Sequence, residues 1–178
     1  RVNYPQHASF LYQAQAEILK RMGNKKAALR LLQEAVKNLP DDPEILYSEV
    51  LLLDPFTDQD LLDKALKQLL NLEPNNPAYL NTYAYTLALQ NRRLDEAKSY
   101  AEHALDSAPD QASILDTLGY ITFLQNDFSS ASNILSKAYG LSQSVNIGVR
   151  YAKSLYMQGA LDQFNQVLQQ LKQNYPND

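Results

Sequence analysis

The sequence predicts an all-α fold built from about five repeated helix–turn–helix units. The prolines Pro40, Pro74 and Pro109 lie 34 and 35 residues apart, and Pro176 follows two further periods later. Only five glycines occur in 178 residues, too few for the tight turns of a β-sandwich. Alanine pairs seven residues apart recur in the same register, at 28/35, 97/104 and 131/138. A period near 34 is typical of helical hairpins that stack into a solenoid.

The ten helices of these units follow in order from apolar periodicity and from capping residues. Asp42-Pro43 and Asn76-Pro77 each place a capping side chain before a proline at the first helical position. Asp110 and Asp127 are expected to cap the two helices of the fourth repeat. The predicted ranges are 8–22, 25–38, 43–53, 59–72, 77–90, 93–107, 111–125, 128–140, 145–158 and 161–174.

The alanine pairs mark where the helices pack most closely. Seven residues are two helical turns, so both alanines lie on one stripe of the second helix of a hairpin. Small side chains there allow helix axes to approach to about 8–10 Å. Repeats two and five depart from the pattern, with Leu62 and Leu69, and Phe164 and Leu171, at these positions. We expect one array over 1–178, divided at about 9–42, 43–76, 77–111, 112–144 and 145–178.

Composition excludes several classes of function. A chain with 45% apolar residues can form a core, and the absence of cysteine rules out disulfides, thiolate metal sites and cysteine nucleophiles. Two histidines and a net charge of −4 argue against a histidine metal centre and against a nucleic-acid binder. No phosphate-binding glycine loop, G-x-S-x-G elbow or H-E-x-x-H helix occurs. We therefore expect no enzymatic activity, no cofactor and no metal.

Charged residues are unevenly distributed along the chain. Residues 1–40 carry a net charge of +5 and residues 41–74 a net charge of −7. This asymmetry either orients a partner or favours self-association, or else marks a solvated face. Asp54, Asp58, Asp60 and Asp63 crowd one turn, but a calcium loop would need a glycine at its sixth position and a glutamate at its twelfth. We expect these carboxylates to cap the 59–72 helix.

The repeats resemble the tetratricopeptide repeat, whose pattern is W-x2-L-G-x2-Y, then A-x3-F, then a closing proline. The first repeat carries Tyr12, Ala16, Leu19, Gly23, Ala28, Leu32, Ala35 and Pro40. The fourth repeat carries Leu115, Leu118, Gly119, Phe128, Ala131, Leu135 and Ala138, with Gln143 in place of the proline. The resemblance covers about 8–176. It implies a right-handed superhelix with a concave groove formed by the first helix of each repeat.

The second, fifth, ninth and twelfth positions of each repeat predict the side chains of this groove. Asn81 and Asp116 can accept hydrogen bonds from an extended backbone, and tyrosines suit a protein or peptide partner, although each one can equally fill the core. A groove for chaperone C-terminal tails is disfavoured, because only Asn81, Arg150 and Lys153 could hold the carboxylate. The predicted partner-binding residues are Tyr47, Asn81, Tyr85, Asp116, Tyr120, Phe123, Lys153 and Tyr156.

Four segments are similar to the C-terminal repeats of bacterial outer-membrane tetratricopeptide lipoproteins. They are FLYQAQAEIL (10–19), DPEILYSEVLLL (42–53), LEPNNPAYLNTYAYTL (72–87) and ILDTLG (114–119). Better-known members of that family bind a periplasmic carboxyl-terminal processing protease and bring it substrates, often cell-wall hydrolases. The resemblance implies such an adaptor, anchored to the outer membrane by a lipid that precedes Arg1, in a longer protein. The alternatives are an assembly scaffold for a pilus or secretin complex, and a cytoplasmic location.

Overall fold

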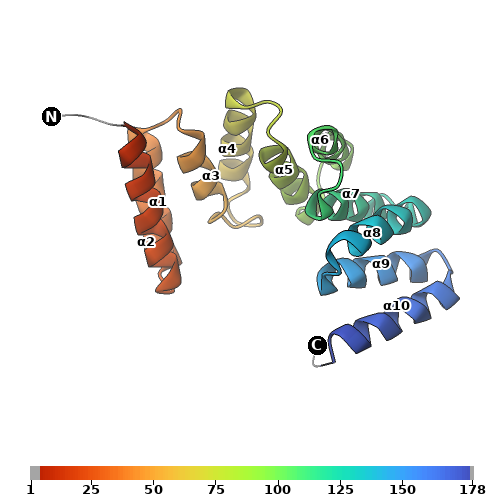
Figure 1. Ribbon diagram of the computed structural model, residues 1–178. Coiled ribbons are helices and arrows are strands. Elements are labelled where there is room, and N and C mark those ends of the chain that lie inside the picture. The colour runs from red at the N-terminus through yellow and green to blue at the C-terminus, as the bar shows by residue number, and fades with distance from the viewer. Residues whose placement is uncertain (1–4, 177–178) are drawn as a thin grey trace. The chain divides into compact units, whose positions relative to one another are not determined.

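The computed structural model describes residues 5–176, and side chains from residue 8 onward. Within that part of the chain there are ten α-helices and no strand (Figure 1). The helices are α1 (Pro5–Arg21), α2 (Lys25–Asn38), α3 (Pro43–Val50), α4 (Gln59–Leu72), α5 (Pro77–Leu89), α6 (Leu94–Ser107), α7 (Ala112–Leu124), α8 (Phe128–Ser142), α9 (Val145–Met157) and α10 (Leu161–Asn174). The ten predicted helices are confirmed, with ends that differ by at most three residues.

The chain forms two compact units. Unit 1 is Arg1–Pro74 and holds α1 to α4, and unit 2 is Asn75–Asp178 and holds α5 to α10. The division falls between the second and third predicted repeats. One continuous array over both units stays a prediction.

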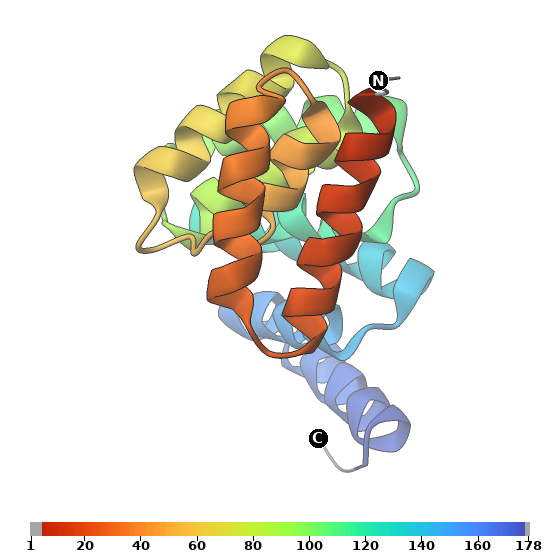
Figure 2. The same cartoon turned by 90° about the vertical axis from the view of Figure 1, so that its left-hand side faces the viewer.

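Unit 1 consists of two helical hairpins. Helices α1 and α2 lie side by side and antiparallel (Figure 2), and α3 packs against both of them and against α4. The core beneath α1 and α2 contains Ala28, Leu32, Ala35 and Ile45, none of which is more than 1% exposed. The first predicted alanine pair therefore lies at the centre of this core.

Unit 2 consists of three hairpins in which each helix packs against the next along the chain. The first helices of successive hairpins also touch, because α7 contacts both α5 and α9. The predicted alanines Ala97, Ala104, Ala131 and Ala138 are all completely buried. Their small side chains leave room for close helix packing, as the sequence predicts.

Capping side chains set most of the predicted helix starts. Asp42 and Asn76 each accept hydrogen bonds from the two backbone N–H groups that open α3 and α5, and Asp127 accepts from the N–H of Ser130 in α8. Asp110 does not cap α7, which was a wrong prediction. Because α7 begins one residue later than expected, Gln111 and not Asp110 occupies the N-cap position. The Gln111 side chain makes no capping hydrogen bond.

The carboxylates before α4 have a different role from the one predicted. Asp58 precedes α4 but caps none of its N–H groups. Its Oδ2 accepts from the backbone N–H of Asp54 at 2.8 Å, while Asp54 accepts from the N–H groups of Phe56 and Thr57. These hydrogen bonds hold the pKa of Asp54 below its usual value. Asp54 and Asp58 therefore stabilise the turn and do not cap the helix, whereas Asp60 lies in the first turn of α4.

None of the helices in 5–176 is long and apolar enough to cross a bilayer. No group of three or more His, Asp or Glu side chains in the described part of the chain could hold a metal ion.

Candidate functional site

Three first helices of unit 2 meet at the side chain of Arg150. From α9, its guanidinium donates hydrogen bonds to the carboxylate of Asp116 on α7 and, at 3.0 Å, to the hydroxyl of Tyr85 on α5. The guanidinium carbon also lies 4.5 Å from the ring centroid of Tyr120 and 5.5 Å from that of Tyr85. We call Tyr85, Asp116, Tyr120 and Arg150 the arginine cluster. It links α5, α7 and α9 through polar and cation–π contacts.

Helical periodicity explains why these side chains converge. Asn81 and Tyr85 are four residues apart on α5, and Asp116 and Tyr120 are four apart on α7, so each pair lies on one face of its helix. The rings of Tyr85 and Tyr120 lie 6.4 Å apart between centroids and are tilted by 54°, a favourable geometry for two aromatic rings. Because α5 and α7 are neighbours, the two faces form a common surface.

The arginine cluster borders an open cleft of about 620 Å³. Three of its members line this cleft together with the start of α7 and the turn between α8 and α9. The full lining is Tyr85, Asp110, Gln111, Ala112, Ser113, Asp116, Leu141, Ser142, Ser144, Asn146, Ile147 and Arg150. Half of these twelve side chains are polar and uncharged, which suits hydrogen bonding to a peptide.

Two buried oxygen atoms at this surface lack a hydrogen-bond donor. They are Oδ1 of Asp116 and Oδ1 of Asn81. Burial raises the pKa of the Asp116 carboxyl, and the charge of Arg150 opposes that rise. A buried acceptor without a donor destabilises a fold. Both atoms would gain from a ligand that supplies N–H groups.

The other predicted groove residues have different aromatic neighbours, are exposed, or belong to unit 1. Phe123 packs on Phe128 at 5.2 Å between ring centroids and is partly buried against the core of unit 2. Tyr156 packs on Phe164 at 5.4 Å but remains 58% exposed, and Lys153 is exposed. Tyr47 is half-buried and belongs to unit 1. Of the predicted set, the structure therefore brings together Tyr85, Asp116 and Tyr120, with Asn81 one turn away on α5.

Arg150 is not among the predicted partner-binding residues, although the sequence names it as one of three side chains that could hold a carboxylate. Helices α7 and α9 begin 33 residues apart, whereas Asp116 and Arg150 are 34 apart. Arg150 therefore occupies the sixth position of its repeat, next to the fifth position that the register assigned to the groove. Its side chain is long enough to reach back to the cluster. A signal for this pair was present in the sequence. Asp116 lies one repeat before Arg150, so an acid and a base of opposite charge stand on neighbouring first helices and can form an ion pair.

Comparisons with known proteins agree with this architecture. A family model for the tetratricopeptide repeat matches residues 10–51. A TPR repeat-containing protein of Pseudomonas aeruginosa is 32% identical over 138 residues, which are 78% of this chain and 23% of that protein. The chain thus corresponds to about a quarter of the length of this relative.

Two solved structures share the fold at low sequence identity. MamA from Desulfovibrio magneticus superposes with a TM-score of 0.80 at 19% identity, over 96% of this chain and 97% of its own. PilF from Pseudomonas aeruginosa gives a TM-score of 0.82 at 19% identity, over 95% of this chain and 77% of its own.

The fold and the site define a helical repeat scaffold of the kind that mediates protein–protein interactions. The sequence match and the shared fold together confirm the resemblance to the tetratricopeptide repeat family.

Proposed function

We propose that this chain is the partner-binding part of a non-enzymatic periplasmic adaptor. It binds a carboxyl-terminal processing protease, its cell-wall-hydrolase substrates, or both, and a lipid attached ahead of this sequence anchors it to the outer membrane. Sequence similarity to outer-membrane tetratricopeptide lipoproteins supports the class of partner. The place of binding is supported by the arginine cluster, in which Oδ1 of Asp116 is unpaired, and by the unpaired Oδ1 of Asn81 one turn away on α5.

The chemistry of the cleft favours a peptide in extended conformation. Backbone N–H groups of such a peptide can donate to Oδ1 of Asp116 and Oδ1 of Asn81, which are buried and unpaired. Tyr85 and Tyr120 offer aromatic surface with little conformational entropy to lose. Because Arg150 already faces the Asp116 carboxylate, the cluster is internally neutralised. It therefore favours polar, uncharged segments over strongly charged ones.

The proposal is tested by affinity capture from a periplasmic extract, with the purified chain as bait, followed by a degradation assay. We expect capture of the protease and faster cleavage of its substrate when the chain is present. Absence of the protease, together with an unchanged cleavage rate, would remove the proposal. Capture of pilus or secretin subunits in its place would favour the assembly scaffold.

A double variant locates the binding surface. Tyr85→Ala with Tyr120→Ala should weaken partner capture at least about tenfold, because interface tyrosines often contribute 2 kcal/mol or more. Tyr100→Ala is the matched control, since Tyr100 on α6 stacks on Tyr83 at 4.8 Å between ring centroids and belongs neither to the arginine cluster nor to the cleft lining. Circular dichroism of each variant checks the fold. A large loss of helicity in the double variant would assign these tyrosines to the core.

A further inference from the structure

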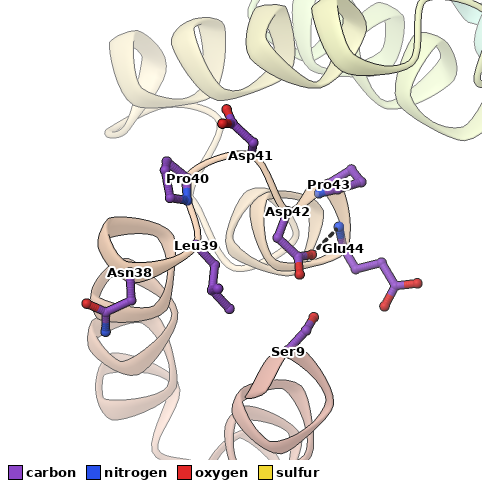
Figure 3. Close-up of a pocket in the computed structure, with 8 residues that line it drawn as sticks. All are labelled: Ser9, Asn38, Leu39, Pro40, Asp41, Asp42, Pro43 and Glu44. Carbon is purple, nitrogen blue, oxygen red and sulfur yellow. Dashed lines mark hydrogen bonds between the residues drawn. The ribbon is translucent and has the colours of Figure 1, made fainter. Parts of the chain in front are cut away.

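Unit 1 contains a second pocket, whose chemistry differs from that of the cleft in unit 2. It lies where the N-terminal part of α1, the end of α2 and the start of α3 meet (Figure 3). Its volume is about 710 Å³, and its lining is Ser9, Asn38, Leu39, Pro40, Asp41, Asp42, Pro43 and Glu44. Every lining residue belongs to unit 1.

A buried hydroxyl group points into this pocket without a partner. Ser9 on α1 is only 5% exposed, and its Oγ makes no hydrogen bond. Figure 3 shows the Ser9 side chain directed toward Asp42 and Glu44. Buried polar groups are nearly always paired, so an unpaired one facing a pocket indicates that a ligand supplies its partner.

The carboxylates around Ser9 are held in place and have acceptor capacity to spare. Oδ1 of Asp42 accepts from the backbone N–H groups of Glu44 and Ile45, at 3.1 Å each, which leaves Oδ2 for another donor. Oε2 of Glu44 accepts from Nε2 of Gln13 at 3.1 Å, and each carboxylate oxygen has more than one acceptor site. The two side chains are therefore oriented before a ligand arrives.

The charge of the pocket is one-sided. Among the side chains that the structure describes, its lining contains the carboxylates of Asp41, Asp42 and Glu44 and no lysine, arginine or histidine. Four of the lining residues, 41 to 44, are the first residues of the segment 41–74, whose net charge is −7. A cation is the ligand that such a field attracts. A metal ion is disfavoured, because no acidic cluster in the described residues has the geometry to hold one.

We propose that this pocket binds a primary ammonium group, supplied by a lysine side chain of a partner protein. An ammonium carries three hydrogen-bond donors, which match the Ser9 hydroxyl oxygen, Oδ2 of Asp42 and the Glu44 carboxylate. The aliphatic stem of the lysine has Leu39 to pack against. This pocket binds a positively charged group, whereas the cleft of unit 2 binds backbone N–H donors through unpaired oxygens and offers aromatic contact. The two sites therefore recognise different features of a partner, and a test of one does not test the other.

The test is an NMR titration of the complete ¹⁵N-labelled chain with the peptide acetyl-Gly-Lys-Gly-amide. We expect saturable shifts of the backbone amides of Ser9, Asp42 and Glu44. The same peptide with its lysine acetylated has no ammonium and should leave these signals unchanged. Equal shifts with the acetylated peptide, or tighter binding of the matched arginine peptide, would overturn the proposal.

Two substitutions assign the binding to the proposed atoms. Ser9→Ala and Glu44→Gln should each weaken the lysine peptide about tenfold, the usual effect of losing one hydrogen bond to a charged group. Glu34→Gln makes the same charge change at an exposed position outside the pocket and should leave the affinity unchanged. Thermal melts confirm that each variant is folded. Equal weakening by Glu34→Gln and Glu44→Gln would show non-specific attraction and overturn the site.

Discussion

The second hairpin of unit 1, α3 and α4, and the second hairpin of unit 2, α7 and α8, pack side chains of different size at equivalent positions of the repeat. In unit 2, Gly119 on α7 faces Leu135 of α8, and Ala131 lies on the same stripe of α8. At the matching positions of unit 1 stand Val50 on α3 and Leu62 on α4. All of these side chains are buried.

The comparison teaches that the repeat requires burial at these positions and not a particular size. A Cβ atom built on Gly119 would lie only 2.5 Å from Cγ of Leu135, so the backbone of α7 closely approaches α8. In unit 1 the larger side chains themselves occupy the corresponding space, and α3 has eight residues where α7 has thirteen. Each hairpin should therefore tolerate only its own combination of sizes.

The largest effect is expected from Leu62→Ala in unit 1. Leu62 is 3% exposed, and truncation of a buried leucine typically costs about 2–5 kcal/mol of unfolding free energy. Leu61→Ala is the matched control, because Leu61 is 47% exposed on the same helix. Urea denaturation measures both. A loss for Leu62→Ala no larger than for Leu61→Ala would mean that the alanine of unit 2 suits this position equally well.

The reverse exchange in unit 2 should destabilise through overpacking. Ala131 is completely buried, and we expect Ala131→Leu to lower the unfolding free energy by about 1–3 kcal/mol. Lys137→Leu adds an apolar side chain to an exposed position of the same helix and should have little effect. An unchanged denaturation midpoint for Ala131→Leu would show that the packing around position 131 in unit 2 accommodates a leucine as well as the packing around Leu62 in unit 1 does.

Two glycines of unit 2 give a sharper version of the comparison. Gly119→Ala brings a Cβ against Leu135 and should destabilise by about 1–2 kcal/mol. Gly140→Ala places its Cβ in open space on α8 and should stabilise by up to about 1 kcal/mol through helix propensity. Thermal unfolding of both variants gives the sign. Stabilisation by both would contradict the close approach of α7 and α8.

The smallest predicted effect compares buried Glu49 of unit 1 with partly buried Asp116 of unit 2. Burial raises the pKa of Glu49 in unit 1, opposed only by the charge of Lys64, whereas Arg150 contacts Asp116 directly in unit 2. An acid whose pKa is raised on folding binds protons more tightly when folded. Its contribution favours the folded state at low pH and is lost as the pH rises through the folded pKa.

Glu49→Gln should therefore stabilise the chain at neutral pH, by on the order of 1 kcal/mol. This advantage should shrink as the pH falls toward 4, where the wild-type glutamate becomes protonated. Urea denaturation at pH 7 and pH 4 measures the difference. An advantage that grows toward pH 4 would have the wrong sign and would contradict the assigned cause of the shift.

Most of the fold follows from local signals in the sequence. The 34-residue period, the buried alanines and the Asp42-Pro43 and Asn76-Pro77 caps predict the helices because each depends on a few neighbouring residues. The errors occur where longer-range geometry decides. Asp58 bonds the turn and not the helix, since the backbone N–H of Asp54 lies within its reach.

The candidate site was less predictable than the fold. The repeat register identified Tyr85, Asp116 and Tyr120, because equivalent positions of neighbouring first helices share a face. It did not assign Arg150 to a groove position, because the role of Arg150 depends on the reach of a long side chain from the adjacent position. It also could not separate Phe123, which packs on Phe128, from Tyr85 and Tyr120, which contact Arg150.

Site-specific photocrosslinking tests most directly whether the cleft beside the arginine cluster binds the partner. A benzoylphenylalanine replaces Ser113, an exposed residue of the cleft lining, or Ser129, an exposed residue of α8 outside the lining. The account predicts crosslinks to a protease or its substrate from position 113 and none from position 129. Crosslinks from position 129 alone, or equally from both, would contradict it.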